Sequence, residues 1–246
     1  MPLFDLSSLQ RPDWLRLKRR CQLCDEVTDH PTHRICTACE AELPWLGAHC
    51  QICAVPLQAT GLICGACQKK APSFTRVEAP WRYGFPIDSL ITRFKHQAQW
   101  PHGRLLAELL AEHLRHAYHE GLPRPQALLP VPLARNRQRR RGFNQAQMLA
   151  HWLGSSLQLP VQTDWLQRPI DTPAQQGLDA LTRKRNLRHA FALQVEAKIS
   201  GAHVALVDDV LTTGATAETL AHLLRRAGAS RIDVYCLART PRPGDG

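Results

Sequence analysis

Two groups of residues in this 246-residue chain have types and spacings that suit chemistry. The first is the stretch from Ala205 to Thr216, ALVDDVLTTGAT, in which an apolar run ends in two acids and continues into a turn rich in hydroxyl groups. The second is a set of cysteine pairs in the N-terminal third. The first group indicates phosphate binding and the second indicates metal ligation.

The turn after the two acids suits a phosphate group. Backbone amides at a helix start, threonine hydroxyls and a glycine that permits close backbone approach can together surround a phosphate dianion. The residues concerned are Thr212, Thr213, Gly214, Ala215 and Thr216. The carboxylates of Asp208 and Asp209 can accept hydrogen bonds from ribose hydroxyls, so the pair favours a phosphorylated sugar over a bare polyphosphate. The alternative is an ordinary Rossmann-like strand, turn and helix with surface acids.

Eight of the nine cysteines form four Cys-x-x-Cys pairs. They are Cys21 and Cys24, Cys36 and Cys39, Cys50 and Cys53, and Cys64 and Cys67. Each pair can bring two thiolates to one tetrahedral ion, and the gaps between pairs allow a short hairpin to return with the next pair. The spacing predicts two structural zinc ions in two zinc ribbons, rather than buried reduced cysteines or a redox dithiol. We favour sharing between consecutive pairs, with an interleaved cross-brace as the alternative.

Beyond about residue 76, strand and helix patterns alternate. Apolar runs at 127–131, 204–207 and 232–237 suit strands, and segments 145–157 and 215–227 suit helices that follow them. A further amphipathic helix has a stripe formed by Leu105, Leu106, Leu109, Leu110 and Leu114. This order predicts an α/β domain with a Rossmann-like parallel sheet. We therefore expect a zinc-ribbon module at 1–75 and an α/β domain at 76–246.

Composition narrows the class of protein and its partners. Hydrophobic residues make up 44% of the chain and charged residues 21%, as in ordinary globular proteins. The absence of a long apolar run or a signal-peptide pattern leads us to expect a cytoplasmic protein, in which disulfides are rare. The net charge is +10, and the part beyond residue 75 holds 23 Lys and Arg against 14 Asp and Glu. A basic domain is expected to have an anionic partner.

The stretch from Ala205 to Thr216 resembles the signature of the type I phosphoribosyltransferases, which implies 5-phosphoribosyl 1-pyrophosphate (PRPP) as ligand. Ala205 departs slightly, because a branched apolar residue is more usual there. RRRGFNQAQ at 139–147, TPAQQGLDALTRKRNLRHAF at 172–191 and the four cysteine pairs occur in ComF proteins, and the chain resembles that family over nearly its whole length. The resemblance implies that Asp208 and Asp209 hold the ribose hydroxyls, that 212–216 hold the 5-phosphate, and that the biology is natural competence or use of external DNA.

The same resemblance supplies further candidate residues. The loop after the first core strand, with Val131, Pro132 and Leu133, is expected to meet pyrophosphate. The next loop is expected to close over pyrophosphate or grip a nucleic-acid backbone through Arg135, Arg137, Arg139, Arg140 and Arg141. We place Arg141 with the two aspartates as a catalytic candidate, and Lys95 is a candidate by resemblance only. A second basic cluster consists of Arg183, Lys184, Arg185 and Arg188. Either arginine run can instead be a solvated surface.

Three functions fit these residues. The first is transfer of a phosphoribosyl group from PRPP, with bound magnesium, to an acceptor that no sequence element identifies. The second is a non-catalytic adaptor that senses PRPP, binds single-stranded DNA and works with a DNA-uptake helicase or another competence protein. The third is a transcriptional regulator built on the same domain.

Overall fold

The computed structural model describes residues 19–169 and 190–241. Contacts divide the chain into two compact units, Met1–Glu42 and Leu43–Gly246. The first unit has one short helix, α1 (Thr37–Ala41), among its described residues, and a β-bridge joins Arg20 to Val27. Its buried apolar residues include Ile35 and Cys21, so the first unit has little apolar core.

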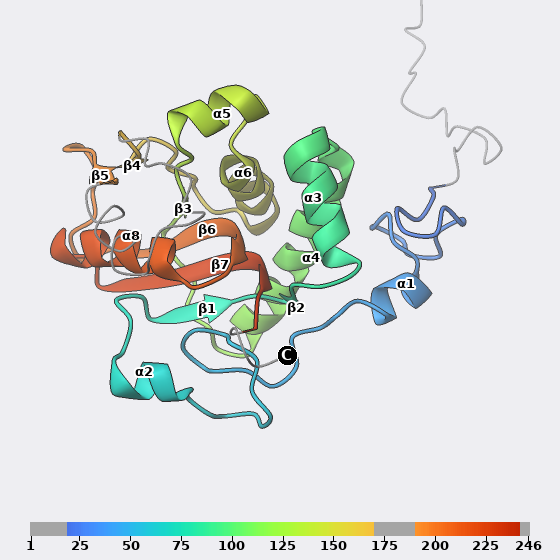
Figure 1. Cartoon of the computed structure of the whole chain (residues 1–246), viewed down its shortest axis with the longest axis horizontal. Helices are drawn as coiled ribbons and strands as arrows, with labels where there is room; N and C mark the ends of the chain where they lie inside the picture. Colours follow the sequence, from blue (N-terminus) through green and yellow to red (C-terminus); the bar gives the residue numbers. More distant parts are fainter. Residues whose placement is uncertain (1–18, 170–189, 242–246) are drawn as a thin grey trace, which may run out of the picture. The chain divides into compact units, whose positions relative to one another are not determined.

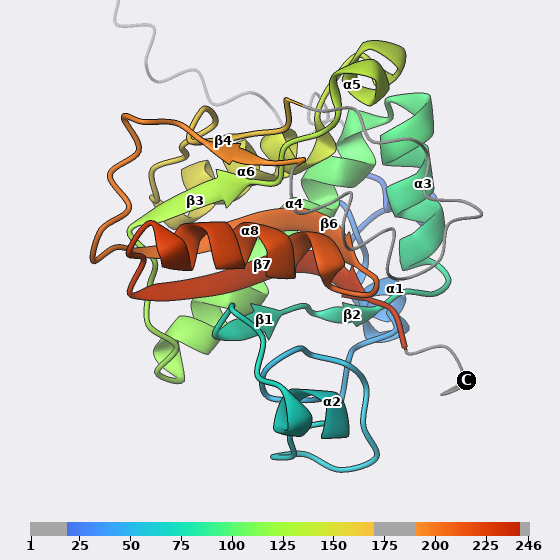
Figure 2. The same ribbon diagram turned by 60° about the vertical axis from the view of Figure 1, so that its left-hand side comes forward.

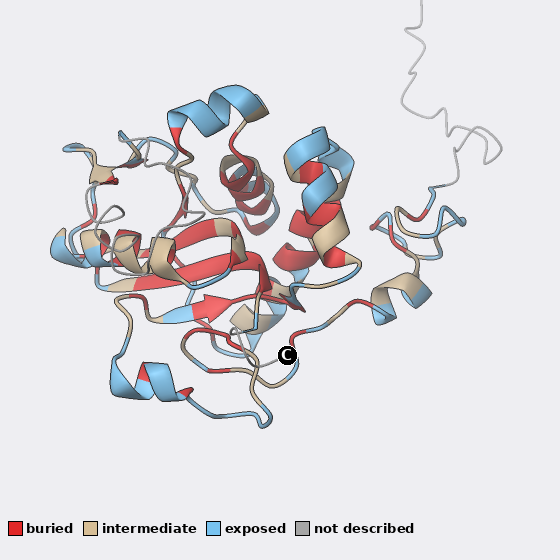
Figure 3. Ribbon diagram, in the orientation of Figure 1, coloured by how far each residue is buried: buried red, intermediate tan, exposed pale blue. Residues whose placement is uncertain are grey.

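The second unit is built on a parallel sheet with the strand order β1-β7-β6-β3, and a short strand β2 also pairs with β7 (Figure 1). The strands are β1 (Arg76–Glu78), β2 (Trp81–Arg82), β3 (Ala127–Pro130), β6 (His203–Leu211) and β7 (Arg231–Arg239). A bridge from Leu128 to Val161 continues the parallel pairing beyond β3. The central strands are largely buried (Figure 3), which explains why their sequences are nearly continuous apolar runs.

Helices cover both faces of this sheet. Figures 1 and 2 show α8 across one face of β6 and β7, with α4 and α6 on the opposite face. The helices are α2 (Gly65–Lys69), α3 (Ile87–Gln97), α4 (Trp100–His119), α5 (Arg135–Arg141), α6 (Gln145–Leu157) and α8 (Ala215–Arg226). An antiparallel pair, β4 (Leu166–Gln167) and β5 (Ala192–Leu193), lies outside the main sheet. The predicted α/β class with a parallel sheet is confirmed.

The apolar stripes predicted from the sequence lie where packing requires them. All five leucines of the predicted stripe are buried on α4. Helix α3 packs against α4 at Gly103, where an added Cβ would lie 2.6 Å from the ring of Phe94. A glycine is therefore needed at this contact, and the close approach holds α3 in place.

Two local expectations were wrong. The arginine run 135–141 forms helix α5 rather than a loop, and Gly142 ends it in the left-handed conformation at a φ of 83°. Strand β6 does not stop at the two acids but continues to Leu211, because its second half pairs with β7 from Asp208 opposite Cys236 to Leu211 opposite Arg239.

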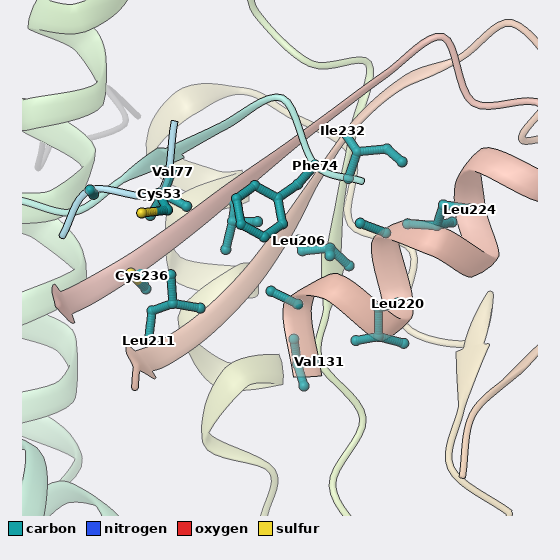
Figure 4. Close-up of a cluster of buried hydrophobic side chains, with 14 of the residues drawn as sticks. Cys53, Phe74, Val77, Val131, Leu206, Leu211, Leu220, Leu224, Ile232 and Cys236 are labelled. Atoms are coloured by element: carbon teal, nitrogen blue, oxygen red, sulfur yellow. The ribbon is translucent and has the colours of Figure 1, made fainter. Parts of the chain in front are cut away.

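The second cysteine cluster lies in the same compact unit as the sheet. The amide of Val77 in β1 donates to the carbonyl of Ile52 at 2.9 Å, and Cys53 shares a buried cluster with Phe74 and Ile232 (Figure 4). The boundary near residue 75 stays a prediction about the sequence modules. The contacts, by contrast, divide the chain between residues 42 and 43.

Candidate functional site

The two adjacent acids stand at the carboxyl end of β6, where parallel α/β sheets bind ligands. The side chain of Asp209 is buried, and its Oδ2 lies 2.8 Å from Nζ of Lys95 on α3. Its Oδ1 accepts a hydrogen bond from the amide of Val210 at 2.7 Å. The structure thus brings Lys95, which the sequence offered only by resemblance, directly to the acid pair.

Asp208 is the more weakly charged member of the pair. Its Oδ1 accepts a hydrogen bond from the amide of Asp209 at 2.9 Å. Burial, followed by repulsion from Asp209, raises the pKa of Asp208 to about 8, although Lys95 acts in the opposite direction. Groups that bring positive charge close to this carboxylate would restore its ionised form.

The loop from Thr212 to Gly214 connects β6 to α8. Thr212 and Thr213 are exposed, and Oγ1 of Thr213 accepts a hydrogen bond from the amide of Ala215 at 3.3 Å. Gly214 has a φ of 77°, which other residues adopt only with strain, and an added Cβ there would meet open space. The α8 N-terminus, which begins at Ala215 as predicted, therefore faces an accessible loop with exposed hydroxyls.

A buried arginine that the sequence did not single out holds this loop. Arg239 is only 5% exposed, and its Nη1 donates to the carbonyls of Leu211 at 2.9 Å, of Thr240 at 2.8 Å and also of Thr212. Its Nε donates to the carbonyl of Cys53 at 2.9 Å. Arg239 therefore joins the loop to the second cysteine cluster.

Asn144 orders the neighbouring loop after β3. Its Nδ2 donates to the carbonyl of Val131 at 3.1 Å, and its Oδ1 accepts from the amide of Ala146, which caps helix α6. The amide of Val131 in turn donates to the carbonyl of Val207 at 2.9 Å, beside the acids. A cavity of about 220 Å³ opens here and is lined in part by Pro132, Leu133, Arg135, Asn144 and Gln147.

The arginines of α5 divide into two sets. Arg141 is half-buried and donates to Oε1 of Gln145, and burial lowers its pKa while the charge of Asp209 acts to raise it. It therefore lies within the electrostatic reach of the acid pair. The others are exposed: Arg135, Arg137, Arg139 and Arg140. The second predicted basic cluster, Arg183, Lys184, Arg185 and Arg188, lies outside the described residues.

The eight paired cysteines form two separate four-sulfur clusters. Cys21, Cys24, Cys36 and Cys39 make the first cluster, and Cys50, Cys53, Cys64 and Cys67 make the second. Within each cluster all sulfurs lie within 4.8 Å of one another, which suits tetrahedral zinc. The favoured sharing between consecutive pairs is confirmed. Cys236, the ninth cysteine, is fully buried in β7, and burial raises the pKa of its thiol.

Family models match both halves of this arrangement. A double zinc ribbon domain matches residues 15–68, and a phosphoribosyl transferase domain matches residues 149–245. The fold and the four-sulfur clusters therefore define a phosphoribosyltransferase-type domain with an N-terminal double zinc ribbon. Within the described residues, no helix has the length and apolar character needed to cross a membrane.

Relatives over most of the chain identify the family. Competence protein F of Haemophilus influenzae is 37% identical over 222 residues, covering 89% of this chain and 96% of the relative. DNA utilization protein YhgH of Escherichia coli K12 is 36% identical over 221 residues with the same coverage. Competence protein ComFC of Bacillus subtilis is 24% identical over 251 residues, covering 89% of this chain and 95% of the relative. The chain belongs to the ComF family of competence and DNA-utilisation proteins.

Among solved structures, a purine phosphoribosyltransferase from Pyrococcus horikoshii is similar to this chain. It is 23% identical, covers 55% of this chain and 70% of its own, and has a TM-score of 0.32.

Proposed function

We propose that the second unit binds PRPP together with magnesium and transfers its phosphoribosyl group to an acceptor. The observation that carries the proposal is the ion pair between Lys95 and Asp209, at 2.8 Å, next to a helix N-terminus with exposed hydroxyls. This combination offers acceptors for sugar hydroxyls, a cation for a phosphate and amides for a second phosphate. PRPP carries all three complementary groups.

Each residue has a role in this proposal. Asp208 and Asp209 accept hydrogen bonds from the ribose hydroxyls, and the loop amides with the hydroxyls of Thr212, Thr213 and Thr216 hold the 5-phosphate. Lys95 and Arg141 supply positive charge beside the pyrophosphate, which the loop of Val131, Pro132 and Leu133 also meets. Attack on ribose C1 breaks its bond to pyrophosphate, which leaves with the bonding electrons.

The acid pair is chemically suited to magnesium, which prefers oxygen ligands. Repulsion between the two carboxylates contributes to the raised pKa of Asp208, and a divalent cation would relieve that repulsion. When bound with PRPP, magnesium would neutralise charge on the leaving pyrophosphate. The residues that would hold it, directly or through the sugar, are Asp208 and Asp209.

Calorimetric titration of the full chain with PRPP tests this proposal, with and without magnesium. We expect Asp208→Asn with Asp209→Asn to weaken binding at least about 10-fold, because each carboxylate hydrogen bond is worth about 1.5–3 kcal/mol. Glu120→Gln, at the exposed C-terminal end of α4, removes one acidic charge elsewhere and is expected to leave binding unchanged. Wild-type affinity in the double aspartate variant would contradict the ribose placement.

The second candidate is a PRPP-sensing adaptor that binds single-stranded DNA. It is favoured by the exposed arginines of α5 and by the names of the relatives, which refer to competence and DNA utilisation. DNA affinity that falls steeply with salt, with a shallower slope in Arg137→Gln with Arg140→Gln, would support it. Magnesium-dependent release of pyrophosphate with a panel of bases and amines would instead support the enzyme.

A further inference from the structure

We infer that Arg239 is a positioning residue that sets the shape of the phosphate loop and couples that loop to the second cysteine cluster. The ligand named for the loop rests on the proposed function above. The coupling rests on the hydrogen bonds of Arg239, which reach the cluster through Cys53 and the loop through Leu211 and Thr212.

The contacts on the loop side determine where its amides point. A trans peptide unit is planar, so its C=O and its N–H point in opposite directions. Arg239 holds the carbonyls of Leu211 and Thr212 toward its own guanidinium. The amides of the two following peptide units, those of Thr212 and Thr213, are therefore turned away from Arg239. That is the orientation a loop needs if its outer side is to receive a phosphate.

The contact on the cluster side fixes the other end of the guanidinium. Cys53 is buried, and its sulfur lies 3.6 Å from that of Cys64, so its backbone position depends on how the four sulfurs are held. A metal ion in the cluster holds them together. Without it, the carbonyl of Cys53 loses its fixed place, and the buried guanidinium loses an acceptor that it needs.

The charges of the two partners are complementary. Four thiolates around one zinc ion carry a net charge of about −2, because four negative charges meet two positive ones. The described acceptors of Arg239 are backbone carbonyls, which carry no full charge. The metal-thiolate cluster is therefore a source of negative charge that stabilises this buried cation.

Arg239→Lys tests the positioning role. A lysine ammonium is compact and cannot span the Cys53 carbonyl and the loop carbonyls as a guanidinium does. We expect the dissociation constant for PRPP with magnesium to rise about 10-fold or more, which corresponds to about 1.4 kcal/mol. Zinc content should stay at that of the wild type.

Arg225→Lys is the matched control. Arg225 also donates to several backbone carbonyls, those of Ser73, Ala229 and Ser230, but at the far end of α8 from the loop. Its substitution should change PRPP affinity by less than about 2-fold. Equal losses in both variants would reduce Arg239 to a general stabilising residue and overturn the inference.

Hydrogen exchange provides a readout that needs no ligand. In Arg239→Lys, amides of residues 212–214 should exchange at least about 10-fold faster, while amides of 204–207 in the buried part of β6 keep their wild-type rates. If the wild type fails to bind PRPP, the proposed function fails, yet this comparison still tests the positioning role. Unchanged exchange in the loop, or equal acceleration in β6, would overturn it.

Zinc release to a coloured chelator tests the coupling. Linkage between two sites is reciprocal, so saturating PRPP should slow release of one of the two zinc ions from the wild type. Arg239→Lys should abolish this slowing, and Arg225→Lys should retain it. Release of both ions that is indifferent to PRPP, in a wild type that binds PRPP, would contradict the coupling.

Discussion

The two cysteine clusters have the same four ligands and nearly the same spacing, but their surroundings differ. In the first cluster Cys24 is exposed and Cys36 and Cys39 are half-buried, whereas all four cysteines of the second are buried. The second cluster also shares a buried core with residues of the sheet, including Leu206 and Ile232. One sequence motif thus serves in two ways, as a small metal-held unit and as an extension of a larger apolar core.

Removing one ligand from each cluster gives the largest expected contrast. Cys67→Ser should lower the melting temperature of the main unit by more than about 10 °C, because a structural zinc site contributes on the order of 10 kcal/mol to folding. Cys39→Ser should leave that transition within about 2 °C, since the first cluster belongs to the other compact unit. Calorimetry checks this, with zinc analysis expected to give about one ion per chain in both variants. Equal shifts would break the comparison.

Apolar truncation should separate the two regions in the same way. Phe74 lies in the core shared by the second cluster and the sheet, so Phe74→Ala should destabilise the main unit by about 3–5 kcal/mol. Ile35→Ala removes a fully buried side chain from the first unit and should leave the main transition unchanged. Urea unfolding followed by circular dichroism measures both. A comparable loss from Ile35→Ala would show that the units unfold together.

Stability of the main unit should depend on pH through Asp208. Its folded pKa of about 8 lies above the unfolded value, so the folded state binds the proton more tightly and loses stability as pH rises toward 8. Between pH 6.5 and 8.5, Asp208→Asn should flatten this decline, each unit of pKa shift being worth about 1.4 kcal/mol. Urea midpoints across that range measure the effect. A steeper decline in the variant than in the wild type would contradict it.

The smallest effect is expected at the surface of the first unit. Arg20 and Asp25 form an ion pair of 3.5 Å with both side chains largely exposed, so Asp25→Asn should cost less than about 0.5 kcal/mol. Asparagine also tolerates the φ of 62° found at this position. Zinc retention against a chelator is the measurement. A marked loss of zinc would mean that the surface of this unit contributes more than its metal ligands suggest.

Local patterns in the sequence accounted for much of the fold and part of the site. Helix α6 has the predicted bounds because Asn144 caps it and its apolar positions repeat at helical spacing. The cysteine sharing followed from gap lengths. The helix α5 was missed because a run of like charges suggests a solvated loop, although Gly142 offers a helix-ending signal.

Long-range contacts account for what the sequence could not predict. Arg239 contacts the carbonyl of Cys53 across 186 residues, and no local pattern in β7 indicates such a partner. The extension of β6 to Leu211 likewise depends on pairing with a strand that lies later in the chain. Asn144 was visible within the family motif, but its bond to Val131 appears only when β3 and α6 are packed together.

The pairing of β1 with β7 has a consequence for the order of events during synthesis. β1 ends at Glu78, directly after the second cysteine cluster, and its neighbour in the sheet begins at Arg231. The ribosome therefore releases these cysteines long before the strand that covers them exists, and contacts this far apart in sequence form late. Metal capture by the second cluster can come early, but enclosure of its sulfurs by the sheet must wait for nearly the whole chain.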